Sequence, residues 1–154
     1  YKGTRTDGPP KGVSMSMMEA LRESYERLDR RFETRSETAI DPDCLLAFDY
    51  EYPGQQAEVV IDTKEFTAVC PWNGLPDLGT LTVAYVPDRS CIELKSLKYY
   101  LLSYGGVGIV QEHAANRILN DLVAACRPLR MTVCLDYKVR GGLHTCVTVN
   151  YGKP

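Results

Sequence analysis

Cys70 stands where a cysteine could act as a nucleophile. It ends a strand-like stretch, precedes Pro71 and opens a loop of turn-forming residues that runs to Asp77. Pro71 favours extended backbone at Cys70, and Asn73-Gly74 favours a tight reversal. Asp77, seven residues on and across that reversal, could fold back and exchange a proton with the thiol. On spacing alone, a buried structural thiol is still the commoner explanation for such a cysteine.

Charged residues also gather at two expected helix starts. Glu93 opens one helix, where the dipole favours a negative charge, and Lys95 and Lys98 share a face that could meet phosphate. Glu112-His113 opens another helix after a glycine-rich loop. The two oxygens of a carboxylate can accept from the adjacent ring N–H and amine of a guanine-like base. At all of these positions a solvated side chain is the commoner explanation.

Hydrophobic periodicity predicts the elements that must position these side chains. Three- and four-residue spacing predicts helices, and alternation predicts strands; in chain order they are a helix at 18–32, strands at 57–62 and 81–85, helices at 93–104 and 110–125, and strands at 131–135 and 143–149. This order favours an α+β fold, with an antiparallel four-stranded sheet in ββααββ order, helices on one face and an additional N-terminal helix. We divide the chain into an N-terminal leader and helix, residues 1–40, and one domain, residues 41–154. So small a domain has little room to enclose a ligand, which favours a site shared between subunits.

The cysteines do not indicate a disulfide framework. There are six, with no CxxC pair. Cys126, Cys134 and Cys146 fall within helix-like or strand-like patterns, so we interpret them as small buried residues in a reduced protein. The two histidines stand at no ligand spacing from a cysteine, and we therefore expect no bound metal.

Bulk composition excludes several classes of function. The 154 residues carry a net charge of −2, which gives no support for a direct nucleic-acid partner. No apolar run is long enough to span a bilayer and no secretory segment opens the chain, so we expect no membrane partner and a cytoplasmic location.

Taken together, these segments resemble the single-domain NADPH-dependent 7-cyano-7-deazaguanine reductases of queuosine biosynthesis, a tRNA modification pathway, which have the tunnelling fold. The resemblance covers about residues 66–151. The most specific stretch is the run ELKSLKYY at residues 93–100, because it separates the nitrile reductases from related cyclohydrolases. The other stretches are the loop from Cys70 to Asp77, residues 112–118 and Val139-Arg140-Gly141-Gly142.

The resemblance implies a covalent mechanism. Cys70 would add to the nitrile carbon and form a thioimide, which accepts hydride better than a nitrile does. Asp77 would take the thiol proton and deliver protons to the nitrogen. Two hydrides convert the nitrile to the aminomethyl group, so two NADPH are consumed per product.

The resemblance also implies binding roles. Substrate contacts are expected from Glu112, Glu93, Ser96 and His113, and contacts with the NADPH phosphates from Lys95, Lys98 and Arg140. No GxGxxG follows a strand, so the cofactor must be held differently from that of a Rossmann enzyme. Self-association is expected too, as pentameric rings that stack in pairs, with active sites at subunit interfaces.

Three departures from the family pattern bear on cofactor binding and rate. Asn73 replaces a common threonine, Gly105-Gly106 replaces Arg-Asn, and Gln111 replaces a histidine before the glutamate. Two other functions remain open. A related amidinotransferase would use the same Cys/Asp pair on a nitrile in tRNA, and a binding-only protein would hold a purine-like nitrile as a dead thioimide.

Overall fold

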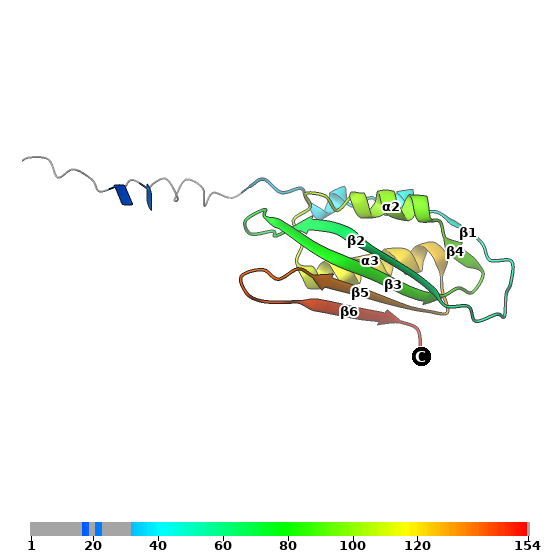
Figure 1. The fold of residues 1–154 in the computed structure, drawn as a ribbon. Coiled ribbons are helices and arrows are strands. Elements are labelled where there is room, and N and C mark those ends of the chain that lie inside the picture. The colour runs from blue at the N-terminus through cyan, green and yellow to red at the C-terminus, as the bar shows by residue number, and fades with distance from the viewer. Residues whose placement is uncertain (1–16, 19–20, 23–31, 154) are drawn as a thin grey trace, which may run out of the picture. The chain divides into compact units, whose positions relative to one another are not determined.

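The computed structural model describes residues 17–18, 21–22 and 32–153 (Figure 1). The chain forms two compact units, Tyr1–Arg30 and Arg31–Pro154. In the first unit the described residues are helical, and its other residues, which include most of the predicted N-terminal helix, lie outside the described residues. Phe32, at the end of that predicted helix, is not helical.

The second unit begins at Arg31, whereas the sequence placed the domain boundary after residue 40. Two contacts explain the difference. The backbone N–H of Arg35 donates to Gly106 O at 2.7 Å, and the Ile40 side chain lies in the hydrophobic core. Residues 32–40 therefore pack as part of the domain.

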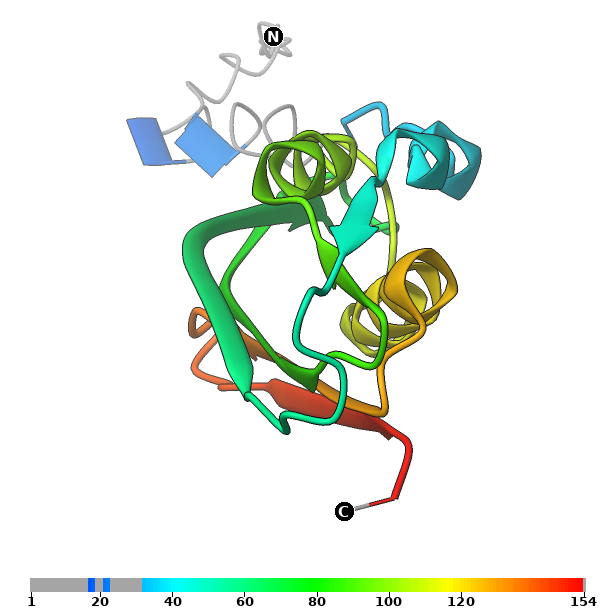
Figure 2. The ribbon, with the colours of Figure 1, turned by 90° about the vertical axis from the view of Figure 1, so that its right-hand side faces the viewer.

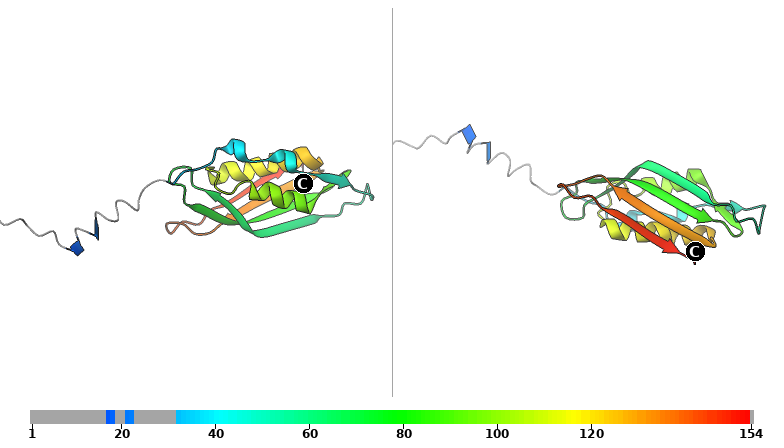
Figure 3. Two further views of the ribbon diagram at one scale, coloured as in Figure 1. Left: turned by 90° about the horizontal axis from the view of Figure 1, so that it is seen from above. Right: turned by 60° about the horizontal axis from the view of Figure 1, so that its bottom comes forward.

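Four long strands form the main sheet of this unit. Their order is β2 (Val59–Val69), β3 (Pro76–Val86), β5 (Arg130–Tyr137) and β6 (Cys146–Tyr151), and every pairing is antiparallel. Between β3 and β5 the chain forms α2 (Leu94–Leu102) and α3 (Gln111–Cys126). The two views of Figure 3 show both helices on one face of the sheet. The α+β class and the four-stranded antiparallel sheet predicted from the sequence are thus confirmed.

Short elements that periodicity did not predict complete the unit. Two 3-10 helices, η1 (Glu37–Ala39) and η2 (Pro42–Cys44), precede β1 (Ala47–Asp49), which pairs with β4 (Ser90–Ile92) as a second small sheet. Figure 2 shows β1 and β4 side by side. No helix in the described part of the chain has the length and apolar character needed to cross a membrane.

A bulge in β2 decides which of its residues face the core. Thr63 pairs with Leu81 and Phe66 with Gly79, so β2 advances three residues while β3 advances two. Before the bulge, odd-numbered residues face the helices; after it, even-numbered residues do, and Phe66 is buried. Because one extra residue exchanges the two faces of a strand, the bulge directs the end of β2 inward at Cys70.

Two of the cysteines interpreted from the sequence as buried lie on the outer face of the sheet. Cys126 is buried, as expected, but Cys134 is only half-buried and Cys146 is exposed. Their Sγ atoms lie 3.4 Å apart on the side of β5 and β6 that the helices leave uncovered. The interpretation of these two as buried residues is wrong, because alternation alone does not say which face of a strand the helices will cover.

The buried phenol of Tyr85 should make the stability of the fold depend on pH in the alkaline range. Its hydroxyl is buried and accepts from the N–H of Ile92 at 3.1 Å, and burial raises its pKa from 10.0 to about 12. Below the unfolded pKa the phenol is protonated in both states. As pH rises from there through the folded pKa, mainly the unfolded chain loses the proton, so stability falls. We expect the urea midpoint to drop between about pH 9 and 12. Tyr85→Phe should flatten that slope, and Tyr52→Phe, at an exposed position, should leave it unchanged.

Candidate active site

Cys70 lies directly after β2, in a loop held by its own hydrogen bonds. Its side chain is buried, with the residue 4% exposed. Its N–H donates to Leu75 O at 2.9 Å, and its carbonyl accepts from Gly74 N at 2.8 Å. Gly74 has a φ of +73°, and a Cβ there would meet Phe32 atoms at 2.8 Å. The Asn73-Gly74 reversal predicted from the sequence is therefore present, and glycine is required in it.

A second backbone segment supports Cys70 from the side of the helices. Val69 donates to Val107 O at 3.0 Å and accepts from Ile109 N at 3.2 Å. Gly108 lies against Pro71, where an added Cβ would stand 3.2 Å from the proline Cα. The glycine-rich stretch between α2 and α3 thus lies directly beside the cysteine loop.

The departure at Gly105-Gly106 is part of this support. The Arg35 side chain donates from Nη1 to Gly105 O at 3.0 Å, and its backbone N–H donates to Gly106 O. Gly106 has a φ of +76°, which favours glycine. Two neutral glycines therefore leave this turn bound to Arg35 rather than loose.

Asp77 lies at the start of β3 on the same inward face as Cys70. It pairs with Ala68, two residues before Cys70, so the two side chains are diagonal neighbours, a relation that spans roughly 7–8 Å between Cα atoms. The residue is 5% exposed. Within residues 32–153, no hydrogen bond joins the Cys70 thiol to the Asp77 carboxylate. The strand register therefore places acid and thiol on one face as diagonal neighbours.

Arg140 contacts Asp77, which the sequence did not predict. Nη1 of Arg140 donates to Oδ1 of Asp77 as an ion pair. The arginine sits on the tight turn between β5 and β6, where Arg140 and Leu143 exchange two backbone hydrogen bonds of 3.0 Å. Gly141 and Gly142 have φ of +59° and +80°. This is a two-residue hairpin turn, in which glycine is favoured at both central positions.

The start of α3 brings Glu112 and His113 to the same end of the domain. Both are exposed in the first turn. The carbonyl of Gln111 accepts from the Tyr137 hydroxyl at 3.4 Å. Burial raises the pKa of Tyr137, and the nearby charges of Asp77 and Glu112 raise it further. Glu112 therefore lies at the end of the domain that holds Cys70 and Asp77, and among the described residues its exposed carboxylate makes no ion pair.

Tyr137 is the residue that the sequence reasoning missed. It is buried against Phe66, with ring centroids 6.3 Å apart, in the space left by Gly79. The sequence did contain a signal for its burial, because Tyr137 continues the inward-facing alternation of the strand predicted at 131–135 by one more position. It closes the hydrophobic core directly behind Asp77.

Glu93 and Ser96 serve α2 itself. The Glu93 carboxylate caps the helix by accepting from Lys95 N at 2.8 Å and Ser96 N at 2.7 Å, and these bonds lower its pKa. The Ser96 hydroxyl donates to Glu93 O at 2.7 Å and accepts from Leu46 N at 3.0 Å. The Ser96 side chain and the Glu93 backbone, whose N–H donates to Leu46 O at 2.9 Å, tie the helix start to the segment before β1.

Removing the Ser96 hydroxyl should therefore lower the stability of the fold. Ser96→Ala removes the acceptor of the Leu46 N–H at a buried position, and should lower the free energy of unfolding by about 1–3 kcal/mol. Urea unfolding measures this loss. Lys95→Ala, one residue earlier and exposed, is the matched control and should change stability little; equal effects of the two would contradict the anchoring role.

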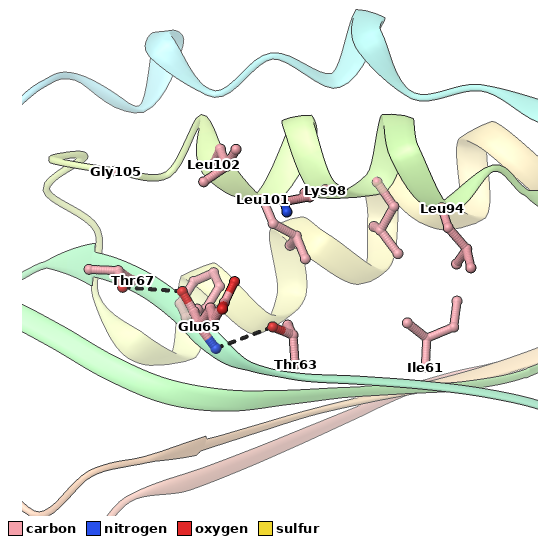
Figure 4. Close-up of a pocket in the computed structure, with 11 residues that line it drawn as sticks. Ile61, Thr63, Glu65, Thr67, Leu94, Lys98, Leu101, Leu102 and Gly105 are labelled. Carbon is pink, nitrogen blue, oxygen red and sulfur yellow. Dashed lines mark hydrogen bonds between the residues drawn. The ribbon is translucent and has the colours of Figure 1, made fainter.

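Glu93 and Cys70 of one chain lie at opposite ends of the domain. A groove of about 330 Å³ runs between α2 and β2 (Figure 4), with Leu94 over Ile61 at one end and Gly105 near Thr67 at the other. Cys70 lies beyond Thr67, nine residues from Ile61, which is roughly 25–30 Å along a strand. The predicted site residues thus form two separate groups.

Lys95 and Lys98 belong to the Glu93 group. Both are exposed on α2, and Lys98 lines the groove. Among the described residues neither ammonium takes part in an ion pair, so both are able to meet an anion. Arg140 lies with Cys70 and Asp77 instead, at the other end. No group of three or more His, Cys, Asp or Glu side chains in the described part of the chain is placed to hold a metal ion.

Comparisons with known proteins place this chain among relatives of one family. A family model described as QueF-like protein matches residues 76–154. The NADPH-dependent 7-cyano-7-deazaguanine reductase of Chlorobaculum tepidum is 53% identical over 114 residues, which cover 74% of this chain and 97% of that protein. The protein of that name from Thermoanaerobacter pseudethanolicus is 48% identical over 125 residues, or 81% and 94% of the two chains.

A solved structure shares the fold. The crystal structure of the archaeosine synthase QueF-Like in the apo form superposes with a TM-score of 0.59 and 25% identity, over 63% of this chain and 95% of that one. The two reductases are about twice as similar in sequence and match over most of both chains. This chain belongs to the family of the NADPH-dependent 7-cyano-7-deazaguanine reductases, the QueF-like proteins.

Proposed function

We propose that this protein reduces the nitrile of 7-cyano-7-deazaguanine to the aminomethyl group with NADPH, as a step of queuosine biosynthesis. The observation that carries the proposal is the pair of Cys70 and Asp77, buried on one face at the ends of two adjacent strands, in a chain 53% identical to a reductase of that name. The same inward face holds a nucleophile and a proton carrier, which addition to a nitrile requires.

Cys70 acts as the nucleophile and Asp77 as the proton carrier. The thiol of Cys70 adds to the nitrile carbon while Asp77 accepts its proton, giving a covalent thioimide. Asp77 then returns protons to the nitrogen. The Cys70 loop is closed by two backbone hydrogen bonds, so the sulfur is held in place before the substrate arrives. Glu112, exposed beside this pair, is the residue placed to accept from the two adjacent donors of the deazaguanine edge.

NADPH would supply the two hydrides that reduction of a nitrile to an amine requires. The residues that fit its phosphates are Lys95 and Lys98, whose exposed ammonium groups have no anionic partner among the described residues. They lie on α2 with Glu93, far from the Cys70 of the same chain. A site that contains both groups requires a second copy.

The protein therefore acts as a homo-oligomer, with each site built between two subunits. One subunit contributes Cys70, Asp77 and Glu112, and its neighbour contributes Glu93 with the lysines of α2. Ser96 is a poorer candidate for a substrate contact than His113, because its hydroxyl already makes two hydrogen bonds within its own chain and His113 is exposed beside Glu112. The family resemblance implies pentameric rings that stack in pairs.

The proposed reductase activity is tested by the stoichiometry of NADPH oxidation. With 7-cyano-7-deazaguanine limiting, oxidation should stop at two NADPH per nitrile, and mass spectrometry should show the aminomethyl product. A deazaguanine without the nitrile is the control and should leave NADPH untouched. A covalent adduct without oxidation would indicate a binding protein instead. Transfer of an amine to the nitrile would indicate an amidinotransferase, the function suggested by the archaeosine synthase fold match.

A further inference from the structure

Arg140 has a partner that a phosphate-binding role does not explain. Its guanidinium donates to the Asp77 carboxylate, although Arg140 itself is about half exposed and Asp77 is almost fully buried. A buried carboxylate is costly unless a positive or hydrogen-bonding group compensates it. Among the described residues Arg140 is the one cation paired with Asp77.

We propose that Arg140 is a positioning residue that acts on the reaction through Asp77, by pairing with its carboxylate and holding it in place beside Cys70. This rests on the proposed function, in which Asp77 carries the protons. The other titratable groups near Asp77 cannot do this. Tyr137 on β5 is neutral, Glu112 on α3 is acidic, and Cys70 after β2 is the thiol on which Asp77 would act.

The hairpin gives Arg140 a defined position. The turn is closed by two hydrogen bonds between Arg140 and Leu143, and the N–H of Lys138 donates to Leu78 O at 2.8 Å, which holds the hairpin against the start of β3. Asp77 is the neighbour of Leu78. The backbone that carries the guanidinium is thus bonded to the strand that carries the carboxylate.

The test is the pH dependence of Cys70 alkylation, measured with iodoacetamide by peptide mass spectrometry, without substrate or NADPH. Removing the guanidinium disfavours negative charge on the Asp77 and Cys70 pair. Arg140→Gln should therefore move the midpoint of the alkylation profile up by about one pH unit. Arg140→Lys keeps the charge and should move it less. Lys138→Gln, which removes an exposed cation directly after β5, should leave it in place.

A double-mutant cycle identifies the route of the effect. In an Asp77→Asn background, Arg140→Gln should cause no further shift. A shift that persists there would overturn the proposal, because Arg140 would then act on Cys70 directly. An unchanged profile with a raised KM for NADPH would also overturn it and leave only a cofactor role. A wild-type Cys70 that never reacts would overturn it as well, since the thiol must be reachable.

The alkylation assay separates this inference from the proposed function. If the wild type oxidises no NADPH but its profile still shifts in Arg140→Gln and not in the double variant, the Arg140 to Asp77 coupling stands while the reductase proposal fails. If NADPH oxidation is normal and the profile does not shift, the reductase stands and the positioning role fails.

Discussion

Replacing Cys70 with alanine is expected to abolish NADPH oxidation with the nitrile, by at least about a thousandfold in kcat, because the covalent path is lost. Intact mass should show a substrate adduct on the wild type when NADPH is withheld, and none on Cys70→Ala. Both readouts depend on the sulfur itself. Asp77→Asn should reduce the rate by about a hundredfold or more, as expected when a proton carrier is removed.

The matched control for Cys70→Ala is Cys134→Ala. Cys134 is also a thiol on the main sheet, but it lies on the outer face and outside the groups described as the site. It should keep the wild-type rate and the adduct. Turnover by a folded Cys70→Ala oligomer would mean that hydride reaches the nitrile without a thioimide, which contradicts the mechanism.

Mixing two inactive variants is expected to restore activity if each site is shared between subunits. Chains with Cys70→Ala keep Glu93, and chains with Glu93→Gln keep Cys70. When the two are dissociated, mixed in equal amounts and reassembled, random pairing gives intact sites in about a quarter of positions. NADPH oxidation should rise from the low level of either variant to about that fraction of the wild-type rate.

Glu112→Gln provides the control for this mixture. Glu112 lies at the same end of the chain as Cys70, at the start of α3, so the two belong to the site half supplied by one subunit. Cys70→Ala mixed with Glu112→Gln should therefore stay inactive. Equal recovery in both mixtures would contradict the assignment of Glu112, and no recovery in either would contradict the shared site. Full activity of Glu93→Gln alone would remove Glu93 from it.

The described elements show how far local patterns reach. Alternation at 131–135 and helical spacing at 110–125 correspond closely to β5 and α3. Periodicity did not extend β2 beyond residue 62, although it runs to Val69. The bulge after Thr63 explains this, because an extra residue breaks the period of two on which strand prediction relies. The same bulge turns Cys70 inward.

The sequence by itself determined the family of this protein and the long helices and strands of its main sheet. The Cys70 to Asp77 loop, the run at 93–100 and the turn at Arg140 are each encoded by residues within a few positions of one another. Only the tertiary structure decided which of these local features meet. It paired Arg140 with Asp77 and separated Glu93 from Cys70 by the length of a strand. Such contacts depend on strand register and on which ends of the elements coincide, and no spacing within one segment specifies these.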